Sequence, residues 1–152
     1  MPPASRQPSL PALLRAARAH CVAEVRRALD DAGFGDIPAN GVAVIGGIAR
    51  GGTPLSGIVR DLGTSKQATG QLVDLLVRRG YLDRAVDPAD RRRLTVAPSE
   101  RGLAAAAVAR AAGERIEAEL ARHVSPEWIA HTRATLQALA GIEENGDEPR
   151  HG

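Results

Sequence analysis

Residues 64–97, TSKQATGQLVDLLVRRGYLDRAVDPADRRRLTVA, change their hydrophobic period halfway along. In the first half Leu72, Leu75 and Leu76 recur at helical spacing, which predicts an amphipathic helix over about residues 64–79. The second half holds two short strand-like runs, residues 81–86 and 94–97, and the cluster DPAD at 87–90 between them has the composition of a turn. The stretch therefore predicts a helix followed by a two-stranded β-hairpin.

The side of this predicted helix opposite its leucines carries polar and small residues. The spacing predicts that these stay outside the core: Ser65, Lys66, Gln67, Thr69 and Gly70. Amide and ammonium groups in the first turns of a helix are the types that read base edges in a DNA major groove. Gln67 suits adenine, Lys66 suits guanine or phosphate, and Gly70 lets the helix backbone approach closely. The alternative is an ordinary solvated first turn.

Hydroxyl side chains stand at the expected starts of helices. Thr53, Thr64 and Ser65 occupy such positions, where a hydroxyl and free backbone N–H groups suit a phosphate.

Three consecutive arginines follow the expected turn: Arg91, Arg92 and Arg93. At a hairpin tip one arginine can enter a minor groove while its neighbours hold phosphates, and Arg84 adds a phosphate contact from the first strand. Residues 64–97 hold seven Lys/Arg against four Asp/Glu, whereas the last ten residues are acidic. The basic excess of the chain thus falls on this stretch. The alternative for the three arginines is a solvated charged turn without a partner.

Composition narrows the class of protein. A chain of 152 residues with 43% hydrophobic residues can form one domain with a core. Aromatic residues make up only 2%, so stacking platforms for single-stranded nucleic acid are scarce and duplex DNA is the better partner. The single cysteine excludes an internal disulfide framework, and no apolar run is long enough to span a membrane. We therefore expect a soluble, cytoplasmic protein.

Five further helices are predicted, three before the central stretch and two after it. Helices are expected at 10–32, capped by Ser9, at 38–50, and at 54–61, the last forming a helix-turn-helix with 64–79, for which Thr64 is the expected cap. In the second helix Val42, Ile45 and Ile48 are the expected buried side. Its glycines make this helix intrinsically weak, and a strand over GVAVIGGI, residues 41–48, is the alternative.

After the hairpin, two helices are predicted at about 99–122 and 126–140. Ser99 and the Ser-Pro pair at 125–126 start them. The first is rich in alanine over 103–112 and carries Leu103, whereas in the second Trp128, Leu136 and Leu139 are expected to face inward, with Trp128 as a packing anchor.

No sequence pattern indicates a cofactor or a metal. There is no Gly-rich phosphate loop and no Cys/His spacing for a metal site. Cys21 shares an apolar stripe with Leu14, Ala17 and Val25, which predicts a buried, inert thiol; the alternative is a redox-sensing thiol.

Several motifs together resemble the MarR family of winged-helix transcriptional regulators. They are LGTSKQ at 62–67, LVDLL at 72–76, RGYL at 79–82, DPADRRR at 87–93 and SERG at 99–102. The resemblance covers about residues 9–140, and the DP-x-DRR wing is its most specific part. This chain departs from the family in having Pro98-Ser99 where Leu-Thr is common, and in the many glycines of its second helix.

The resemblance implies a mainly α fold with a small β-wing, that is, a winged helix-turn-helix with a helical dimerisation domain. Residues 9–34 and 98–142 would form the dimerisation region and residues 37–97 the DNA-binding lobe. Residues 1–8 and the acidic tail 143–152 are expected to be disordered.

The same resemblance implies a homodimeric repressor that binds a pseudo-palindromic operator in double-stranded DNA. The recognition helix at about 64–79 would enter the major groove and the wing at 84–95 the minor groove, with Arg92 inserted and Asp90 orienting it. A small aromatic or phenolic effector, or cysteine oxidation, would relieve binding. The alternatives are a winged-helix protein-interaction module without DNA binding and, less favoured because no cofactor loop is present, an enzyme that dimerises through a winged helix.

Overall fold

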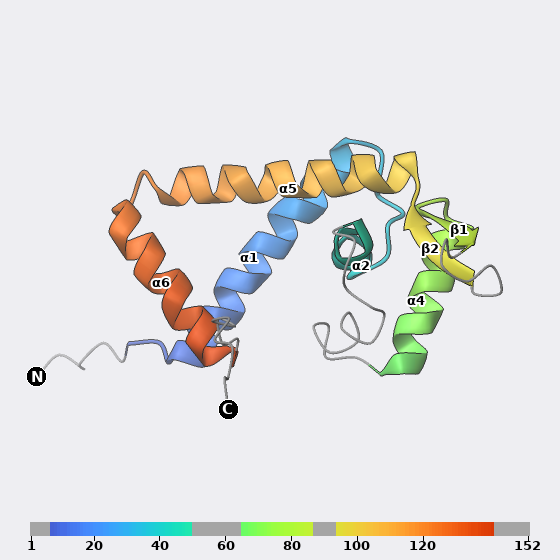
Figure 1. Cartoon of the computed structure of the whole chain (residues 1–152). Coiled ribbons are helices and arrows are strands. Elements are labelled where there is room, and N and C mark those ends of the chain that lie inside the picture. Colours follow the sequence, from blue (N-terminus) through green and yellow to red (C-terminus); the bar gives the residue numbers. More distant parts are fainter. Residues whose placement is uncertain (1–6, 50–64, 87–93, 142–152) are drawn as a thin grey trace, which may run out of the picture. The chain divides into compact units, whose positions relative to one another are not determined.

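The computed structural model describes residues 7–49, 65–86 and 94–141, without the side chains of residues 85, 86 and 94 (Figure 1). These residues form helices and one two-stranded antiparallel sheet, which confirms the predicted mainly α fold with a small β-wing. The chain divides into two compact units, residues 1–114 and 115–152, and each is described by itself. The predicted helix 54–61, and with it Thr53, Thr64, residues 90–93 and the acidic tail, lie outside the described residues.

The first helix, α1, spans Leu10–Asp31, as predicted. Ser9 occupies the N-cap position, but its side chain makes no capping hydrogen bond, so that part of the prediction is wrong. The chain leaves the helix through Gly33, whose φ of +83° favours glycine. Only Leu29 of α1 is fully buried, because the helix packs on the core through its C-terminal end.

The glycine-rich segment forms a helix, α2 (Gly41–Ala49), rather than a strand. Its fully buried side chains are Val44 and Ile45, whereas the predicted Val42 and Ile48 are half-buried. The first glycine is required by packing, since a Cβ at Gly41 would lie 3.0 Å from Cγ1 of Ile37 and 3.1 Å from Cδ2 of a leucine on the next described helix.

That helix is α4, Lys66–Arg78, which confirms the predicted amphipathic helix. Ser65 is its N-cap, and the Ser65 Oγ accepts a hydrogen bond of 3.1 Å from the amide of Ala68. The prediction of Thr64 as the cap was therefore off by one residue. The buried residues of α4 are Thr69, Val73 and Leu76.

The hairpin consists of β1 (Leu82–Val86) and β2 (Leu94–Pro98), close to the predicted limits. The strands are antiparallel, and Leu82 pairs with Pro98 at one end and Val86 with Leu94 at the other. Helix α4 contacts β1, while α2 contacts both β2 and α4, so the hairpin is fixed to two helices at its base.

Helix α5, Glu100–Leu120, follows the hairpin directly. As predicted, Ser99 starts it: the Ser99 Oγ accepts a hydrogen bond of 3.0 Å from the amide of Gly102. Its buried face consists of small residues, Gly102, Ala105, Ala109 and Ala112. Leu103, the leucine next to Gly102 on this helix, is 50% exposed.

One hydrophobic core holds the first unit together. It joins α1, α2, α4, β1 and α5 around nine buried residues: Leu29, Ile37, Val44, Ile45, Val73, Leu76, Tyr81, Leu82 and Ala105. Burial of such side chains from water is the main term that stabilises this arrangement.

The second unit contains the C-terminal end of α5 and helix α6, Pro126–Leu139. Ser125 caps α6 as predicted, and Arg133 of α6 pairs with Glu117 of α5 at 3.2 Å. No residue of α6 is fully buried, and Trp128 is 68% exposed. The prediction that Trp128, Leu136 and Leu139 face inward is therefore wrong for the single chain.

Candidate functional site

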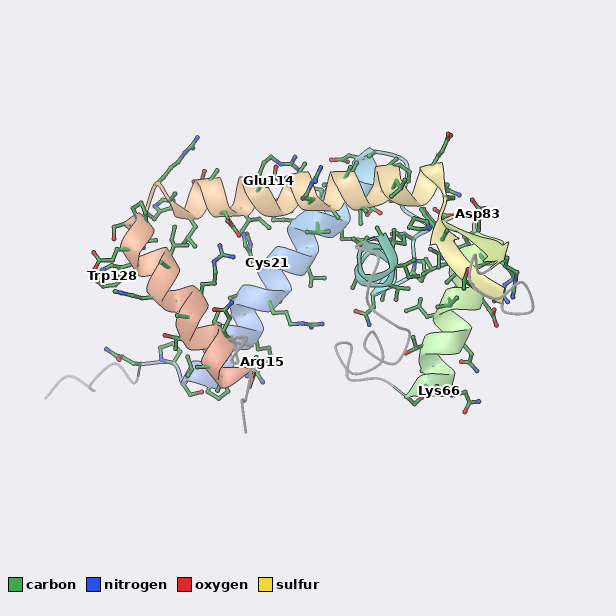
Figure 2. The ribbon with its side chains drawn as sticks, in the orientation of Figure 1. Arg15, Cys21, Lys66, Asp83, Glu114 and Trp128 are labelled. Atoms are coloured by element: carbon green, nitrogen blue, oxygen red, sulfur yellow. The ribbon has the colours of Figure 1, made fainter. Side chains whose placement is uncertain are left out.

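The outer face of α4 presents three polar side chains. Lys66, Gln67 and Gln71 are exposed, and Gly70 is half-buried between them. Figure 2 shows Lys66 at the N-terminal end of the helix. A Cβ at Gly70 would meet no atom within 4 Å, so this part of the helix backbone is open. Gln71 was missed from the sequence, although its position four residues after Gln67 places it on the same face.

Thr69 was predicted to lie on the exposed face of this helix, and that prediction is wrong. Its side chain is only 1% exposed, so it does not face solvent beside Gln67. Thr69, Val73 and Leu76 share one stripe at spacings of four and three residues, and this stripe faces the core. The predicted buried face rested on the leucines alone. Because Val73 is also buried, the observed buried face is turned toward Thr69.

Arg84 lies on β1 next to the outer face of α4. Its Nη2 lies 3.1 Å from Oδ1 of Asp74, and both side chains are more than half exposed. An exposed pair of this kind contributes at most about 1 kcal/mol, so Arg84 can exchange Asp74 for another anion at little cost. Arg84 thus connects the hairpin with α4.

At the other end of α4, a carboxylate joins three segments of the chain. Oδ1 of Asp36 accepts hydrogen bonds of 2.5 Å from the Tyr81 hydroxyl and 2.8 Å from Nη2 of Arg101. Nη1 of Arg101 also donates to the carbonyl of Arg79 at 2.8 Å, and its guanidinium lies 4.4 Å from the centre of the Tyr81 ring. The Arg79 side chain donates to the carbonyl of Asp36.

These contacts shift the pKa of both Tyr81 and Asp36. Burial, followed by the hydrogen bond to Asp36, raises the pKa of Tyr81 to about 12. The hydrogen bond from Tyr81, helped by the charges of Arg101 and Arg79, lowers the pKa of Asp36. Asp36 is therefore an anion and Tyr81 a neutral donor throughout the physiological pH range.

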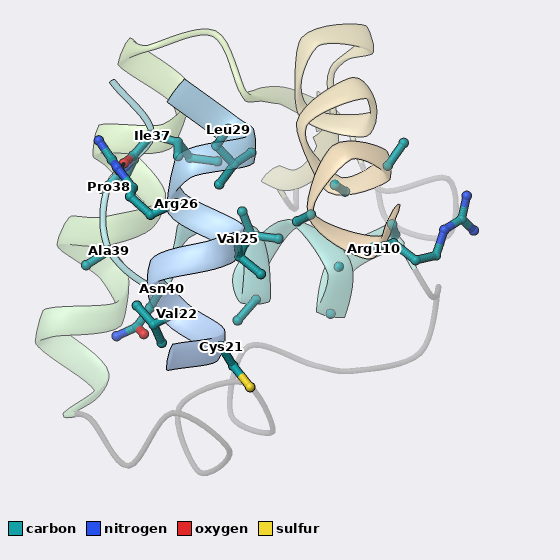
Figure 3. Close-up of a pocket in the computed structure, with 18 of the residues that line it drawn as sticks. Cys21, Val22, Val25, Arg26, Leu29, Ile37, Pro38, Ala39, Asn40 and Arg110 are labelled. Carbon is teal, nitrogen blue, oxygen red and sulfur yellow. Dashed lines mark hydrogen bonds between the residues drawn. The ribbon is translucent and has the colours of Figure 1, made fainter. Parts of the chain in front are cut away.

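The first unit contains a cavity of about 1190 Å³ (Figure 3). Its lining comes from α1, residues 37–40, α2 and α5, and most of it is apolar, with Val22, Val25 and Leu29 on the α1 side. Arginines also reach it, namely Arg18, Arg26 and Arg110. Sequence reasoning did not find this cavity, because its walls come from separate segments.

Cys21 lines the same cavity, and its side chain is exposed. The prediction of a buried thiol is wrong, because the apolar stripe of α1 is covered in the first unit only near Val25 and Leu29. Figure 3 shows the sulfur beyond the end of the Val22–Leu29 stretch.

Within residues 7–49, 65–86 and 94–141, no three His, Cys, Asp or Glu side chains are grouped so that they can hold a metal ion. None of the helices described above has the length and apolar character needed to cross a membrane.

Residues 36–93 match the model of the MarR family. No curated protein matches the chain in sequence. The family match covers α2, α4 and β1, ends just before β2, and confirms the predicted resemblance there.

Solved structures share the fold over most of the chain. The crystal structure of CouR from Rhodococcus jostii RHA1 bound to p-coumaroyl-CoA is 23% identical, with a TM-score of 0.70, and the match covers 89% of this chain and 94% of that one. The MepR–DNA complex from S. aureus is 18% identical, with a TM-score of 0.71 and coverages of 89% and 98%. A transcriptional regulator of the MarR family from Rhodococcus sp. RHA1 is 22% identical, with a TM-score of 0.67 and coverages of 88% and 95%.

Proposed function

Because residues 36–93 are a MarR-family segment in a chain with the fold of MarR-family regulators, we propose that this protein is a cytoplasmic transcriptional regulator that binds double-stranded DNA as a homodimer. The observation that carries the proposal is the outer face of α4, where Lys66, Gln67 and Gln71 are exposed on a helix whose opposite side is buried in the core. A helix held in this way can enter a major groove with these side chains toward the bases. The regulator class argues against the enzyme alternative.

The wing supplies the second part of the proposed surface. Arg84 lies beside α4, where it pairs with Asp74, and the two antiparallel strands β1 and β2 lead to residues 87–93. In the proposal Arg92 enters the minor groove, Asp90 orients it, and Arg91 and Arg93 hold phosphates.

Replacing Arg92 by alanine should weaken binding to the operator by about 1–3 kcal/mol, the usual range for one specific contact. The dissociation constant of both chains should be measured at one fixed salt concentration. An unchanged constant would remove Arg92 from the proposed surface.

Replacing Gly70 by alanine should raise stability and lower DNA affinity at the same time. The added methyl group meets open space within the chain, so the helix gains up to about 1 kcal/mol from the better helix former. If the α4 backbone lies against DNA at this point, the same methyl group obstructs the approach. Urea unfolding and a DNA titration of the same variant measure the two effects, and equal DNA affinity would show that DNA does not approach Gly70.

Homodimerisation is supported by the distribution of exposed apolar side chains. Among the described residues, the large hydrophobic side chains that are exposed all lie on α1, α5 and α6: Leu10, Leu13, Val22, Leu103, Leu120, Trp128, Leu136 and Leu139. Exposed apolar patches on soluble proteins mark protein–protein contact sites, and in the proposal a second copy of the chain covers these side chains. In the proposal the region 9–34 with 98–142 forms the dimer, so that two lobes read a pseudo-palindromic operator. The mass in solution, measured by light scattering, tests this.

A gel-shift assay at two salt concentrations tests the proposal as a whole. The probe is the DNA upstream of the protein's own coding region, and a scrambled duplex of the same composition is the control. Binding that prefers the upstream DNA and weakens with salt supports the regulator. No binding at low salt would contradict it and favour the alternative of a protein-interaction module.

The cavity supports control by a small aromatic or phenolic effector. Its apolar walls suit a ring, and Arg18 lines it without an ion pair to another described residue, so it can meet an acidic group. In the related fold of CouR the ligand is p-coumaroyl-CoA, which contains such a ring. We expect a phenolic acid to lower the affinity for the operator, and calorimetry with phenolic acids tests binding directly.

Cysteine-based control is the second candidate, because Cys21 is exposed rather than buried. Its thiol is open to oxidants in the single chain. Mass spectrometry after mild peroxide treatment would detect a sulfenic adduct or a linked dimer. Finding neither would rule this candidate out.

A further inference from the structure

Asp36 lies where the main chain is held from both sides. Arg26 of α1 donates to the carbonyl of Ile37 at 2.9 Å and also to the carbonyl of Gly35. Ile37 is buried, and its amide donates to the carbonyl of Phe34 at 3.1 Å. The carboxylate of Asp36 is therefore presented on a fixed backbone.

Three side chains reach this fixed point: Arg79 and Tyr81 just after α4, and Arg101 in the first turn of α5. The Tyr81 hydroxyl and Arg101 both donate to Asp36, and Arg79 donates to its carbonyl. The Tyr81 side chain is fully buried, with Phe34 6.4 Å away between ring centres and Arg101 over its face. We call Asp36, Arg79, Tyr81 and Arg101 the Asp36 clamp.

The clamp holds the end of α4 that is remote from the proposed DNA contacts. Figure 1 shows the C-terminal end of α4, the start of β1 and the first turn of α5 side by side, and hydrogen bonds from Arg101 and Ser99 join them. The 13 residues of α4 span about 20 Å at 1.5 Å per residue, so a tilt of about 5° at Tyr81 moves Lys66 by roughly 2 Å. Such a shift exceeds the tolerance of a hydrogen bond to a base.

We propose that the Asp36 clamp is a positioning device, in which Asp36 and Tyr81 fix the angle of α4 and of the hairpin base and so set the preference for the operator over other DNA. This inference rests on the proposed function for its DNA readout. Contacts to phosphates tolerate small displacements better than contacts to base edges, because charge attraction falls slowly with distance. Loss of the clamp therefore acts on specificity before it acts on general DNA binding.

The test compares Asp36→Asn, Tyr81→Phe and the double variant with wild type. Tyr81→Phe removes one hydroxyl and keeps the ring, while Asp36→Asn removes the charge and keeps the shape. Asp31→Asn is the matched control, since Asp31 is exposed in the last turn of α1 and has no ion pair with another described residue; light scattering verifies that it and the clamp variants keep the oligomeric state of wild type. The probes are a duplex that the wild-type chain selects from a random-sequence pool and a scrambled duplex of equal length, at a temperature where circular dichroism shows every variant folded.

Each single variant should bind the selected duplex about tenfold more weakly, the loss expected for one charge-assisted hydrogen bond, with binding to the scrambled duplex within about twofold of wild type. The double variant should lose less than the product of the two single losses, because both changes weaken the same hydrogen bond from Tyr81 to position 36, while Asp36→Asn also weakens the bond from Arg101. Asp31→Asn should match wild type. Equal losses on both duplexes, or no loss on the selected one, would overturn the clamp while leaving the proposed function standing.

A second readout does not depend on DNA. The amide of Tyr81 donates to the carbonyl of Leu76 at 2.9 Å, and the amide of Ser99 donates to the carbonyl of Tyr81 at 3.1 Å. Both amides therefore report on the place where α4, β1 and α5 meet. Hydrogen exchange at these two amides should quicken in Asp36→Asn and Tyr81→Phe and stay unchanged in Asp31→Asn. Unchanged exchange would overturn the clamp. If the wild-type chain selects no duplex, the proposed function fails, and the exchange result still decides on the clamp.

Discussion

Replacing Gly102 by alanine is expected to destabilise the chain by about 3 kcal/mol, the upper end of the usual cost of overpacking. A Cβ at this position would lie 2.1 Å from the carbonyl oxygen of Tyr81 and 3.1 Å from its carbonyl carbon. These are backbone atoms of another segment, so no side-chain rotation can relieve the contact. The oxygen is also fixed, because it accepts the amide hydrogen bond of Ser99 at 3.1 Å.

Gly113 offers a matched control on the same helix. A Cβ there would meet no atom within 4 Å, so Gly113→Ala should leave stability unchanged or raise it by up to about 1 kcal/mol. Urea unfolding of both variants measures the difference. A Gly102→Ala chain as stable as Gly113→Ala would mean that β1 and α5 are not packed as described.

The sequence predicts the elements of this fold better than their orientation. Hydrophobic period and turn residues placed α1, α2, α4, α5, α6 and the hairpin within a few residues of their observed limits. The buried face was harder to predict. Residues 72–77 of α4 are apolar except for Asp74, so several phases of the helix fit, and tertiary packing selects the one that buries Thr69.

Helix α5 buries its small residues and leaves a larger one exposed. The close approach of the helix to Tyr81 buries Gly102 and Ala105, while the larger Leu103 is left exposed. A hydrophobicity pattern ranks leucine above alanine as a core residue, but a close helix contact favours the smaller side chain. In α6 the apolar stripe is real, yet the described residues of the single chain do not bury it.

The candidate site was predictable where it depends on local sequence. Lys66 and Gln67 are exposed in the first turn of α4, as expected from their positions. The Asp36 clamp was not predicted, because its contacts join residues 45 and 65 positions apart along the chain. A hydrogen bond between such distant residues leaves no periodic signal in a single sequence. The cavity escaped prediction for the same reason.

Lys66 and Gln67 should contribute to DNA binding in different ways, although they are neighbours. Replacing Gln67 by alanine is expected to weaken binding to the operator by about 1–3 kcal/mol per half-site, and so by about 2–6 kcal/mol for a homodimer. The loss comes from an amide that can bond both edge groups of an adenine, so other sequences should be affected much less. Both side chains are exposed and alanine is a good helix former, so folding should be unaffected.

Replacing Lys66 by alanine should instead weaken binding to all sequences alike. An ammonium that neutralises a phosphate releases about one counterion, so the slope of log K against log salt should fall by about 1 for each subunit. Titrations of operator and scrambled duplex at several salt concentrations separate the two effects. Gln137→Ala and Arg115→Ala, at exposed positions in the second unit, are matched controls once light scattering shows that they keep the oligomeric state of wild type. A Gln67 variant that loses affinity equally for both duplexes would make Gln67 a phosphate contact, and base reading would then have to come from Gln71 or the wing.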